Sequence, residues 1–408
     1  MMVRYSRCVG AVKPAGSWTR NGGGCYARGM RRGERPPGRA PLGEVAALFL
    51  RLGLTAFGGP AAHVAMMEHE AVVRRRWLSR ERFLDLLGVA SVLPGPGSSE
   101  LAIYLGYVRA GWPGLLLGGA CFIAPAAVLV AVLAHLYARF GALPQAAGVL
   151  YGVRPVVVAI VLHAVWRLAR TAVRDAASAA VALGAAALSV AGLAPVTALL
   201  AAGIALAAIR APRRGLPVVL PALSGGAPAG AAVGLGSLFL VFVKVGALVF
   251  GSGYVLLAFL RADLVERLGW LTERQLLDAV AVGQVTPGPV FTTATFVGYL
   301  LAGWVGAAVA TAGVFLPAFV LVAASGPFVA ALRRSTLVAS VLDGVTVGSL
   351  ALMAVVTWQL ARAALVDVPT AVLALAGAVA LLRLRLGSTW LIAAGAALGT
   401  VLGGPRAP

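Results

Sequence analysis

The stretch LPGPGSSELAIYLG, residues 93–106, interrupts a long apolar sequence with a glycine between two prolines. It recurs in the second half of the chain as VTPGPVFTTATFVG, residues 285–298. Proline removes a backbone donor and glycine adopts torsions that other residues avoid, so each stretch predicts a broken helix. Two breaks of the same kind indicate that the fold is built from two related units, each organised around its break.

The composition is that of a membrane protein. Hydrophobic residues make up 60% of the 408 residues, charged residues 12%, and the mean hydropathy is +0.91. Between residues 112 and 403, apolar runs close to the roughly 20 residues that cross a bilayer recur. We therefore predict an all-α polytopic membrane protein. The net charge of +20 comes from short basic clusters between apolar runs, which favours a role in topology over nucleic-acid binding.

Enzyme and metal chemistry find no support in the motifs. The three cysteines have neither paired nor metal-type spacing, and the sequence contains no HExxH or CxxC. We expect no catalytic residues, no metal site and no cofactor. Residues 1–43 form a basic tail without the apolar core of a secretory signal, and we interpret them as disordered or as the product of a start placed too early.

An internal repeat covers most of the chain. A shift of 193 positions places Phe57 on Phe250, Trp77 on Trp270 and the Pro-Gly-Pro at 94–96 on that at 287–289. Beyond a one-residue gap the shift is 192, and Trp166 then falls on Trp358. Collinear matches of Trp, Gly and Pro predict two homologous halves, 44–210 and 235–403, joined by a linker at 211–234.

The basic clusters predict that the halves have opposite orientations. If the arginine-rich loop at 74–82 is inside and residues 83–110 enter and leave from that side, about five spans per half place residues 261–275 outside, and that loop is charge-balanced. The basic tail is the exception to this inverted-topology repeat. One alternative is that the first segment is a re-entrant hairpin turning at 57–60, in which case the simple count requires a further crossing segment.

The broken helices predict an anion site. Paired interruptions in two halves of a transporter point to its central site, and half-helix N-termini bind negative charge through free N–H groups. We expect such groups at Gly97, Ser98 and Ser99, and at residues 290–293 in the second half. The alternative is that the breaks are kinks that serve packing only. If a single break holds the anion, we expect it to be the first.

Charged residues beside the breaks have two interpretations each. Arg51 and Lys244 either attract the anion or extend toward the membrane surface. Glu100, Glu70 and His63 are candidates for carrying a coupled proton. Asp85 and Asp278 occupy equivalent positions, for which a helix cap or a loop salt bridge is the favoured interpretation. The predicted substrate-binding residues are Arg51, Phe57, Gly58, Gly59, Pro94, Gly95, Pro96, Gly97, Ser98, Ser99, Lys244, Gly251, Ser252, Gln284, Pro287, Gly288, Pro289 and Thr292.

These motifs resemble the chromate ion transporter family. The similarity is carried by residues 57–87, 93–107 and 111–114 in the first half and by 249–257 and 270–304 in the second. Family motif positions fall on Phe57, Gly58, Gly59, His63, Glu70, Trp77, Pro94, Gly95, Pro96, Glu100 and Gly106. Two departures occur: Ser91 stands where members often carry a glutamine, which the second half keeps as Gln284, and Ser252 replaces a glycine.

The resemblance implies a two-domain, multi-pass exporter of the cytoplasmic (inner) membrane that lowers cytoplasmic chromate. Transport would be driven by the membrane potential or a proton gradient, with sulfate as a competing mimic. The alternatives are an anion channel and a transporter of another tetrahedral oxyanion such as sulfate. The predicted partners are this oxyanion and the lipid bilayer; a homodimer is compatible with the sequence, and no nucleic acid is expected.

Overall fold

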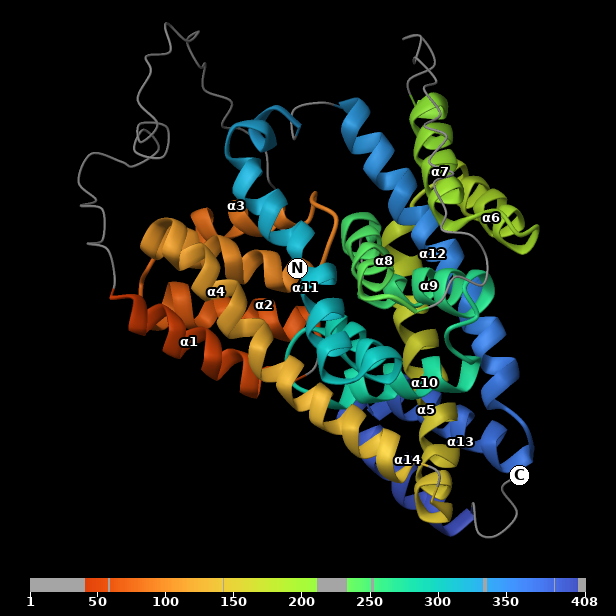
Figure 1. Cartoon of the computed structure of the whole chain (residues 1–408). Coiled ribbons are helices and arrows are strands. Elements are labelled where there is room, and N and C mark those ends of the chain that lie inside the picture. Colours follow the sequence, from red (N-terminus) through yellow and green to blue (C-terminus); the bar gives the residue numbers. More distant parts are fainter. Residues whose placement is uncertain are drawn as a thin grey trace, which may run out of the picture. The chain divides into compact units, whose positions relative to one another are not determined.

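The structure is a computed structural model that describes residues 41–57, 59–141, 143–210, 233–250, 253–332, 336–384 and 386–402. Within these ranges the chain forms helices and their connections, without β-strands (Figure 1). The first half contains α1 (Leu42–Thr55), α2 (Pro60–Glu68), the π-helix η2 (His69–Arg74), α3 (Arg80–Ala90), α4 (Gly97–Phe140), α5 (Pro144–Ala172), α6 (Ala176–Val190) and α7 (Pro195–Arg210).

The second half repeats this order. It contains α8 (Leu235–Leu248), η3 (Gly253–Val255), α9 (Leu256–Leu260), the π-helix η4 (Arg261–Arg267), α10 (Glu273–Val285), η5 (Val290–Thr292), α11 (Thr293–Leu332), α12 (Thr336–Ala364), α13 (Val368–Val379), η6 (Ala380–Leu384) and α14 (Ser388–Leu402). Each element has its equivalent at the spacing that the sequence predicted, and the two homologous all-α halves are confirmed.

The first segment of each half is a hairpin. Glu44, in the first turn of α1, forms an ion pair with Arg75 just beyond η2, with 2.9 Å between Nη1 and Oε1. Arg51, near the other end of α1, pairs with Glu70 on η2 at 2.9 Å. Both contacts require η2 to run back along α1, so the chain turns between Thr55 and Pro60. This is the re-entrant alternative that the glycines at 57–60 suggested.

Helices α4 and α11 each contain a reversal. A Cβ placed on Gly118 would lie 2.8 Å from the carbonyl oxygen of Ala102, although 16 residues of straight helix span about 24 Å. The chain therefore folds back at Ala110–Gly111, where Gly111 has φ of 66°, and at the equivalent Gly303, with φ of 60°. Glycine is the residue that accepts such torsions without steric cost. Each Pro-Gly-Pro is thus followed by a half-helix and a return.

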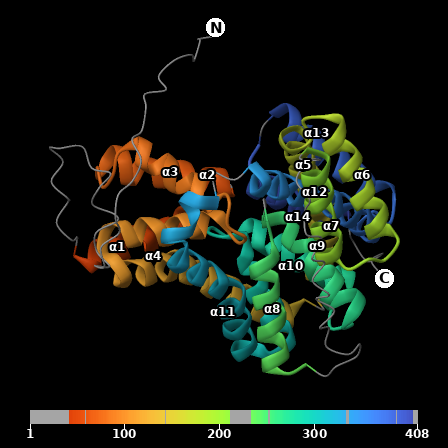
Figure 2. The ribbon, with the colours of Figure 1, turned by 90° about the horizontal axis from the view of Figure 1, so that it is seen from above.

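The halves run in opposite directions. Tyr104, early in α4, hydrogen-bonds Ser325, late in α11, while His135, late in α4, hydrogen-bonds Tyr299, early in α11. Within their own helices, Gly118 lies against Ala102 and Gly106, which flank Tyr104, and Gly306 lies against Gly298, next to Tyr299. In the arms after the reversals, Gly118 is therefore on the Ser325 side and His135 on the Gly306 side, so these arms of α4 and α11 are antiparallel; Figure 2 shows the helices side by side. Because α4 and α11 are equivalent in sequence, an antiparallel pair means that one half is inverted relative to the other, as predicted.

The halves also exchange their last two helices. Gly152 on α5 lies against Gly395 and Gly399 on α14, and Gly203 on α7 lies against Gly344 on α12. In the same way α13 packs on α5 and α6 packs on α12 (Figure 1). Small residues allow this close approach of helix backbones in a membrane. Each half is therefore completed by helices from the other.

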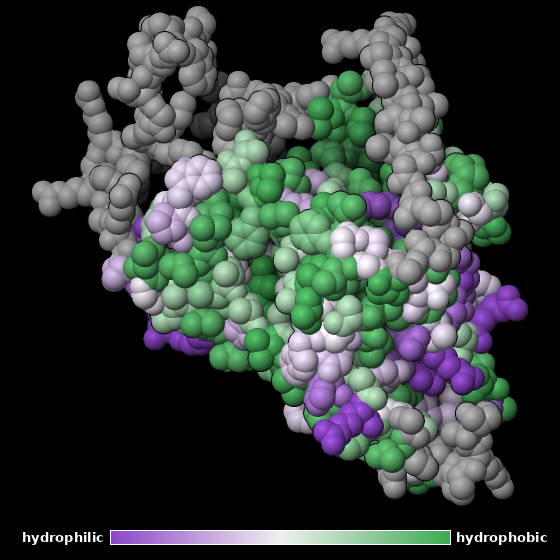
Figure 3. Space-filling model, in the orientation of Figure 1, coloured by the Kyte–Doolittle hydropathy of each residue, from purple (hydrophilic) through white to green (hydrophobic). Residues whose placement is uncertain are grey.

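The surface is that of a protein that spans a membrane several times. Four helical segments are long and apolar enough to cross a bilayer: Gly97–Phe140, Ala146–Ala172, Val290–Ser325 and Leu337–Ala364. Large apolar side chains are widely exposed, including Leu183 (73%), Trp358 (68%) and Val401 (77%), and apolar residues cover much of the face in Figure 3. In water such exposure would be costly, so lipid must cover these helices.

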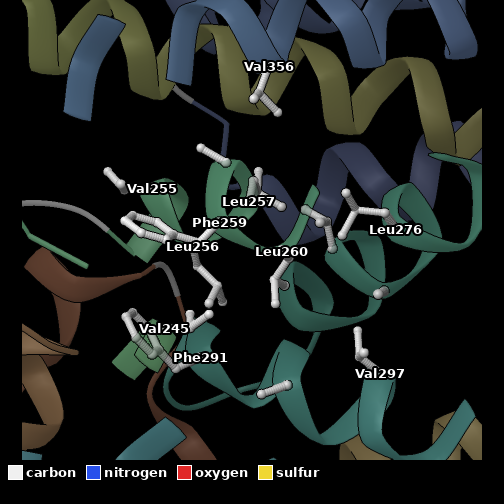
Figure 4. Packing of buried hydrophobic residues seen from close by; sticks show 14 of the residues in the cluster. Val245, Val255, Leu256, Leu257, Phe259, Leu260, Leu276, Phe291, Val297 and Val356 are labelled. Atoms are coloured by element: carbon white, nitrogen blue, oxygen red, sulfur yellow. The ribbon is translucent and has the colours of Figure 1, made fainter. Parts of the chain in front are cut away.

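The core around the second break is tightly packed. Side chains from α9, including Leu256, Phe259 and Leu260, pack with Leu276 of α10 and Phe291 of η5 (Figure 4). This cluster continues into α5, α8, α11 and α12, so residues of both halves fix the position of the second Pro-Gly-Pro.

Candidate functional site

The breaks of the two halves cross at one place. The N–H of Gly95, inside the first Pro-Gly-Pro, donates to the carbonyl oxygen of Val249 at 2.8 Å. The N–H of the equivalent Gly288 donates to Ala56 at 3.0 Å. Ala56 and Val249 are themselves equivalent, each preceding the Phe-Gly of its half. The breaks that the sequence predicted separately are therefore joined by two symmetric hydrogen bonds between the halves.

The central glycines are required by this crossing. Gly95 and Gly288 have φ of 136° and 92°, which disfavour any side chain. A Cβ on Gly288 would also lie 2.7 Å from the Cβ of Ala126, which cannot move aside by rotating. A Cβ on Gly95 would lie 2.5 Å from Oε1 of Glu100. The prolines at 94, 96, 287 and 289 flank these glycines and fix the backbone on either side.

A polar cavity of about 30 Å³ lies beside the crossing, on the side of the second break. Both halves line it, and the residues are Ala56, Gly59, Tyr254, Gly283, Gln284, Thr286, Gly288, Val290 and Ser388. Of these, Gly59, Gln284 and Gly288 were predicted site residues. The sequence-based expectation favoured the first break, whereas the cavity combines the Phe-Gly-Gly turn of the first half with the Pro-Gly-Pro of the second.

Gln284 supplies a hydrogen-bond donor to this cavity. Its Oε1 accepts from the hydroxyl of Tyr254 at 3.0 Å, while its buried Nε2 has no hydrogen-bond partner among the described residues. Only 8% of the residue is exposed. A buried amide without a partner is costly, so a ligand that accepts from it would be favoured.

His63 connects the two breaks of the first half. Its Nε2 lies 3.0 Å from the carbonyl oxygen of Ala56, which can only accept, so Nε2 carries the proton. Its Nδ1 lies 3.3 Å from Oγ of Ser98, in the first turn of α4, and in the neutral ring accepts from that hydroxyl. His63 therefore ties the Phe-Gly-Gly turn to the half-helix after Pro96.

Two buried side chains beside Ser98 make no hydrogen bond in the described part of the chain. These are the hydroxyl of Ser99 and both carboxyl oxygens of Glu100, and both residues have an exposed fraction of 0%. Burial of an ionised carboxylate without a partner is very costly in a membrane protein. Glu100 therefore differs from Glu70 and Asp278, which are also buried near the breaks but form ion pairs.

The free N–H groups are fewer than predicted. The N–H of Ser99 donates to Pro96 at 2.7 Å, and that of Thr292 donates to Pro289 at 3.0 Å. Thr293 likewise donates back into η5. The hydroxyl of Thr292 also bonds to Pro289. The first turns after the breaks use these N–H groups in hydrogen bonds of their own. The expectation of free N–H groups at Ser99, Thr292 and Thr293 was therefore wrong, and only the N–H groups at the first two positions of each turn remain as donors.

Arg51 and Lys244 belong to matching ion-pair clusters. Arg51 and Arg74 both contact Oε1 of Glu70, at 2.9 and 3.0 Å. In the second half, Lys244 and Arg267 contact Asp263 at 2.9 and 3.1 Å. All three positions are related by the shift of 193. Each cluster joins the two arms of a hairpin. Arg51, Lys244 and Glu70 are therefore engaged in ion pairs that stabilise the hairpins.

Asp278 makes an ion pair that spans the halves. Nε and Nη2 of Arg154 donate to its two oxygens at 2.8 and 2.9 Å, and Tyr137 donates at 2.8 Å. Asp278 is fully buried, so the helix cap or loop salt bridge expected for it is not what the structure shows. Its equivalent, Asp85, is exposed on α3.

The remaining predicted residues fall in two groups. Gly58, Gly251 and Ser252 lie outside the described residues, as do 1–40 and 211–232 of the predicted tail and linker. Phe57 is 47% exposed and Gly97 is exposed at the start of α4.

Three residues that line the cavity were missed by sequence reasoning: Tyr254, Thr286 and Ser388. Tyr254 and Ser388 match Ala61 and Val196 in the first half, so the repeat gave no signal for them.

Comparison with known proteins identifies the family. The chromate transporter family matches residues 43–207 and again 236–400. A chromate transport protein of Cupriavidus metallidurans is 36% identical over 88% of this chain and 92% of its own length. One from Pseudomonas aeruginosa is 34% identical over 82% and 84%, respectively. A probable chromate transport protein of Synechococcus elongatus is 33% identical over 81% and 87%. No solved structure matches. The chain belongs to the chromate transporter family.

Proposed function

We propose that this chain exports chromate from the cytoplasm across the inner membrane as a secondary active transporter. The observation that supports the proposal most directly is the polar cavity at the crossing of the two breaks, which both halves line and into which Gln284 offers an unpaired donor. The relatives named as chromate transport proteins cover most of the chain and support the substrate.

The chemistry of the cavity suits a tetrahedral oxyanion. Amide, hydroxyl and backbone donors bind negative charge without fixing it too tightly for release, and helix N-termini add a favourable dipole. Gln284 supplies a free amide donor. The hydroxyls of Tyr254 and Thr286 also line the cavity, and they donate to Oε1 of Gln284 and to the carbonyl oxygen of Val282, so a bound anion would have to compete for them. A volume of about 30 Å³ holds only one or two waters, so the breaks must separate to admit the anion. Binding is then coupled to movement of the halves.

In this proposal Glu100 carries the coupled proton. It is buried without an ion-pair partner in the described ranges, and it lies beside Gly95 and the Ser98–His63 pair. Arg51, Lys244 and Glu70 hold the hairpins through their ion pairs. Proton release from Glu100 into the pathway as chromate passes in the opposite direction would give export driven by the proton gradient.

The test is chromate uptake into everted membrane vesicles from cells that express the chain. Uptake should require an imposed proton gradient or membrane potential, and excess sulfate should reduce it if both dianions share the site. Vesicles with Glu100→Gln should bind chromate and fail to concentrate it. Absence of gradient-dependent uptake in wild-type vesicles would overturn the proposal.

An anion channel is the second candidate, because half-helix termini also line channels. Electrical recording of the purified chain in a planar bilayer separates the two. A channel gives chromate current without proton movement, whereas the transporter gives flux that moves protons in fixed proportion.

A further inference from the structure

The equivalent helices α3 and α10 are docked differently. On α10 every residue from Leu276 to Ala281 is buried, and the helix packs against α5, α12 and α14. On α3 only Phe83, Leu86 and Ala90 are buried, and the helix packs chiefly against α4. The ion pairs of Glu70 and Asp263, the crossing hydrogen bonds and the reversals are symmetric, whereas the docking of these two helices is not.

An ion pair between a fully buried carboxylate, Asp278, and a partly exposed arginine, Arg154, joins α10 to α5. Arg154 of α5 binds Asp278 through two hydrogen bonds, and Tyr137 of α4 adds a third. Such bidentate pairs are directional, and removal of one partner leaves a buried charge. The residue equivalent to Arg154 is Thr346, so the same pair has no counterpart on α12. The latch, defined as Tyr137, Arg154 and Asp278, belongs to one side of the molecule.

The latch and the cavity lie toward opposite ends of α5. Arg154 follows Gly152, which packs against Gly395 and Gly399 of α14. Helix α14 is antiparallel to α5, so its first residue, Ser388, which lines the cavity, lies toward the end of α5. That end carries Arg167, Arg170 and Arg174, which the positive-inside rule places in the cytoplasm. The latch is therefore on the extracytoplasmic side of the cavity.

Movement of α10 would also move the site. Asp278 and Gln284 lie on the same 13-residue helix, which leads directly into Thr286 and the second Pro-Gly-Pro. If α10 leaves α5, Gln284 and Thr286 move with it, and the cavity loses its wall on the latch side. Docking of α10 and the shape of the anion site are thus mechanically coupled.

We propose that the latch is the extracytoplasmic gate of the transporter. Intact, it seals the cavity from that side and leaves the cytoplasmic side to take up the anion; broken, it opens the cavity outward for release. The proposal rests on the proposed transport function. It assigns Arg154 and Asp278 as gating residues that act through α10 rather than as ligands of the anion.

The experiment measures access to a single cysteine at Ala281, which is buried on α10 between Asp278 and Gln284. Cys8, Cys25 and Cys121 are first replaced, and whole cells are treated with a membrane-impermeant maleimide without chromate. In the latched protein labelling is slow. Asp278→Asn should accelerate it by roughly tenfold or more, because the lost pair shifts the gate toward open. Combining Arg154→Asp with Asp278→Arg should restore slow labelling.

The control is Asp85→Asn, the same change on the equivalent exposed helix, which should leave labelling unchanged. If Asp278→Asn does not give a monodisperse protein, Tyr137→Phe removes only one hydrogen bond and should accelerate labelling by a smaller factor. Unchanged labelling in both variants, or equal acceleration by Asp85→Asn, would refute the gate. Because no chromate is present, this result is independent of whether chromate is the substrate.

Discussion

At the scale of single residues, Gln284 has the clearest role in the proposed anion site. Tyr254 occupies its carbonyl oxygen, and its amide nitrogen is buried without a partner among the described residues, so a bound oxyanion would supply the missing acceptor. Hydrogen bonds to charged groups contribute about 1.5–3 kcal/mol. The side chain is neutral and short, which lets the site bind a dianion and also release it.

We predict that Gln284→Glu abolishes chromate binding, because it places a negative charge where the anion binds. Gln284→Ala should weaken binding by roughly tenfold to a hundredfold, since it removes one donor. Chromate-dependent thermal stabilisation of the purified protein measures both. Gln275→Glu is the matched control on the same helix: it keeps a favoured capping-box residue at α10 and should bind chromate as wild type does. Equal loss in the control would contradict a local role.

A second residue-scale prediction concerns pH and Asp175, in the turn before α6. Hydrogen bonds from Ser178, together with the charge of Arg210, lower the pKa of Asp175 from 3.8 to about 2. The stabilisation is therefore complete above 3.8 and is lost as the pH falls through about 2. The melting temperature of Asp175→Asn should lie below that of wild type at about pH 5, and the two should converge near pH 2. A difference that does not change with pH would contradict this assignment.

The residues that sequence could and could not reveal differ in a physical way. Gly95, Gly288 and Gln284 were visible because backbone breaks and a polar residue beside them stand out in apolar sequence. The ion-pair partners of Arg51 and Lys244 could have been found from the repeat. Their partners Glu70 and Asp263 are 193 positions apart, as Arg51 and Lys244 are. Tyr254 and Ser388 carried no such signal, because only folding brings η3 and α14 to the same cavity.

At the scale of elements, the exchange of helix pairs between the halves determines the architecture. Helix α5 packs on α13 and α14, and α12 packs on α6 and α7. The contacts depend on glycines, and a side chain at Gly152 would collide with the backbone at Gly395 and Gly399. The sequence predicted these helices but not which helices pack against each other. Short apolar helices have similar compositions, and their pairing depends on where their small residues come into contact.

We predict that Gly152→Leu destabilises the protein by about 1–3 kcal/mol or more, since it overpacks this interface. Gly184→Leu on α6 is the matched control, because a Cβ there meets nothing within 4 Å. The melting temperature of each purified variant, followed by size-exclusion fluorescence, checks the prediction. Similar melting temperatures for the two variants would show that the α5–α14 contact is not tight.

The reversals in α4 and α11 mark the limit of prediction at this scale. Sequence predicted the broken helices at the Pro-Gly-Pro sites and offered a turn at 57–60, which the structure has. It treated residues 83–110 as a segment that leaves on the side where it enters, and that segment ends where the structure has the Ala110–Gly111 reversal. It did not assign the turn to a glycine there or at Gly303, because a single glycine within an apolar run is also compatible with an uninterrupted helix. The reversal is evident only in the structure, where Gly118 packs against the backbone of Ala102.

At the scale of the whole molecule, two inverted halves share one site. The antiparallel pairing of α4 with α11 and the symmetric Gly95 and Gly288 hydrogen bonds place the breaks of both halves together. A pseudo-twofold arrangement of this kind lets the same site face either side of the membrane when one helix of a pair moves. The different docking of α3 and α10 accompanies a difference in sequence, since Thr346 stands in the second half where the first has Arg154.

Inversion predicts opposite locations for the two equivalent loops. Reporter domains fused after residues 78 and 272 should be active on opposite sides of the membrane, with the first in the cytoplasm because of Arg74, Arg75 and Arg76. Enzymatic reporters that work only in the cytoplasm or only outside it measure this. Activity of both fusions in the same compartment would contradict the inverted arrangement.

The most direct test of the central claim is chromate flux through the purified chain in proteoliposomes with an imposed proton gradient. We predict that wild-type protein accumulates chromate against its concentration gradient, that collapse of the proton gradient stops accumulation, and that Gln284→Glu protein gives only the leak of empty liposomes. Accumulation by the Gln284→Glu variant at the wild-type rate would show that the anion passes elsewhere. No flux through correctly folded wild-type protein would contradict the account as a whole.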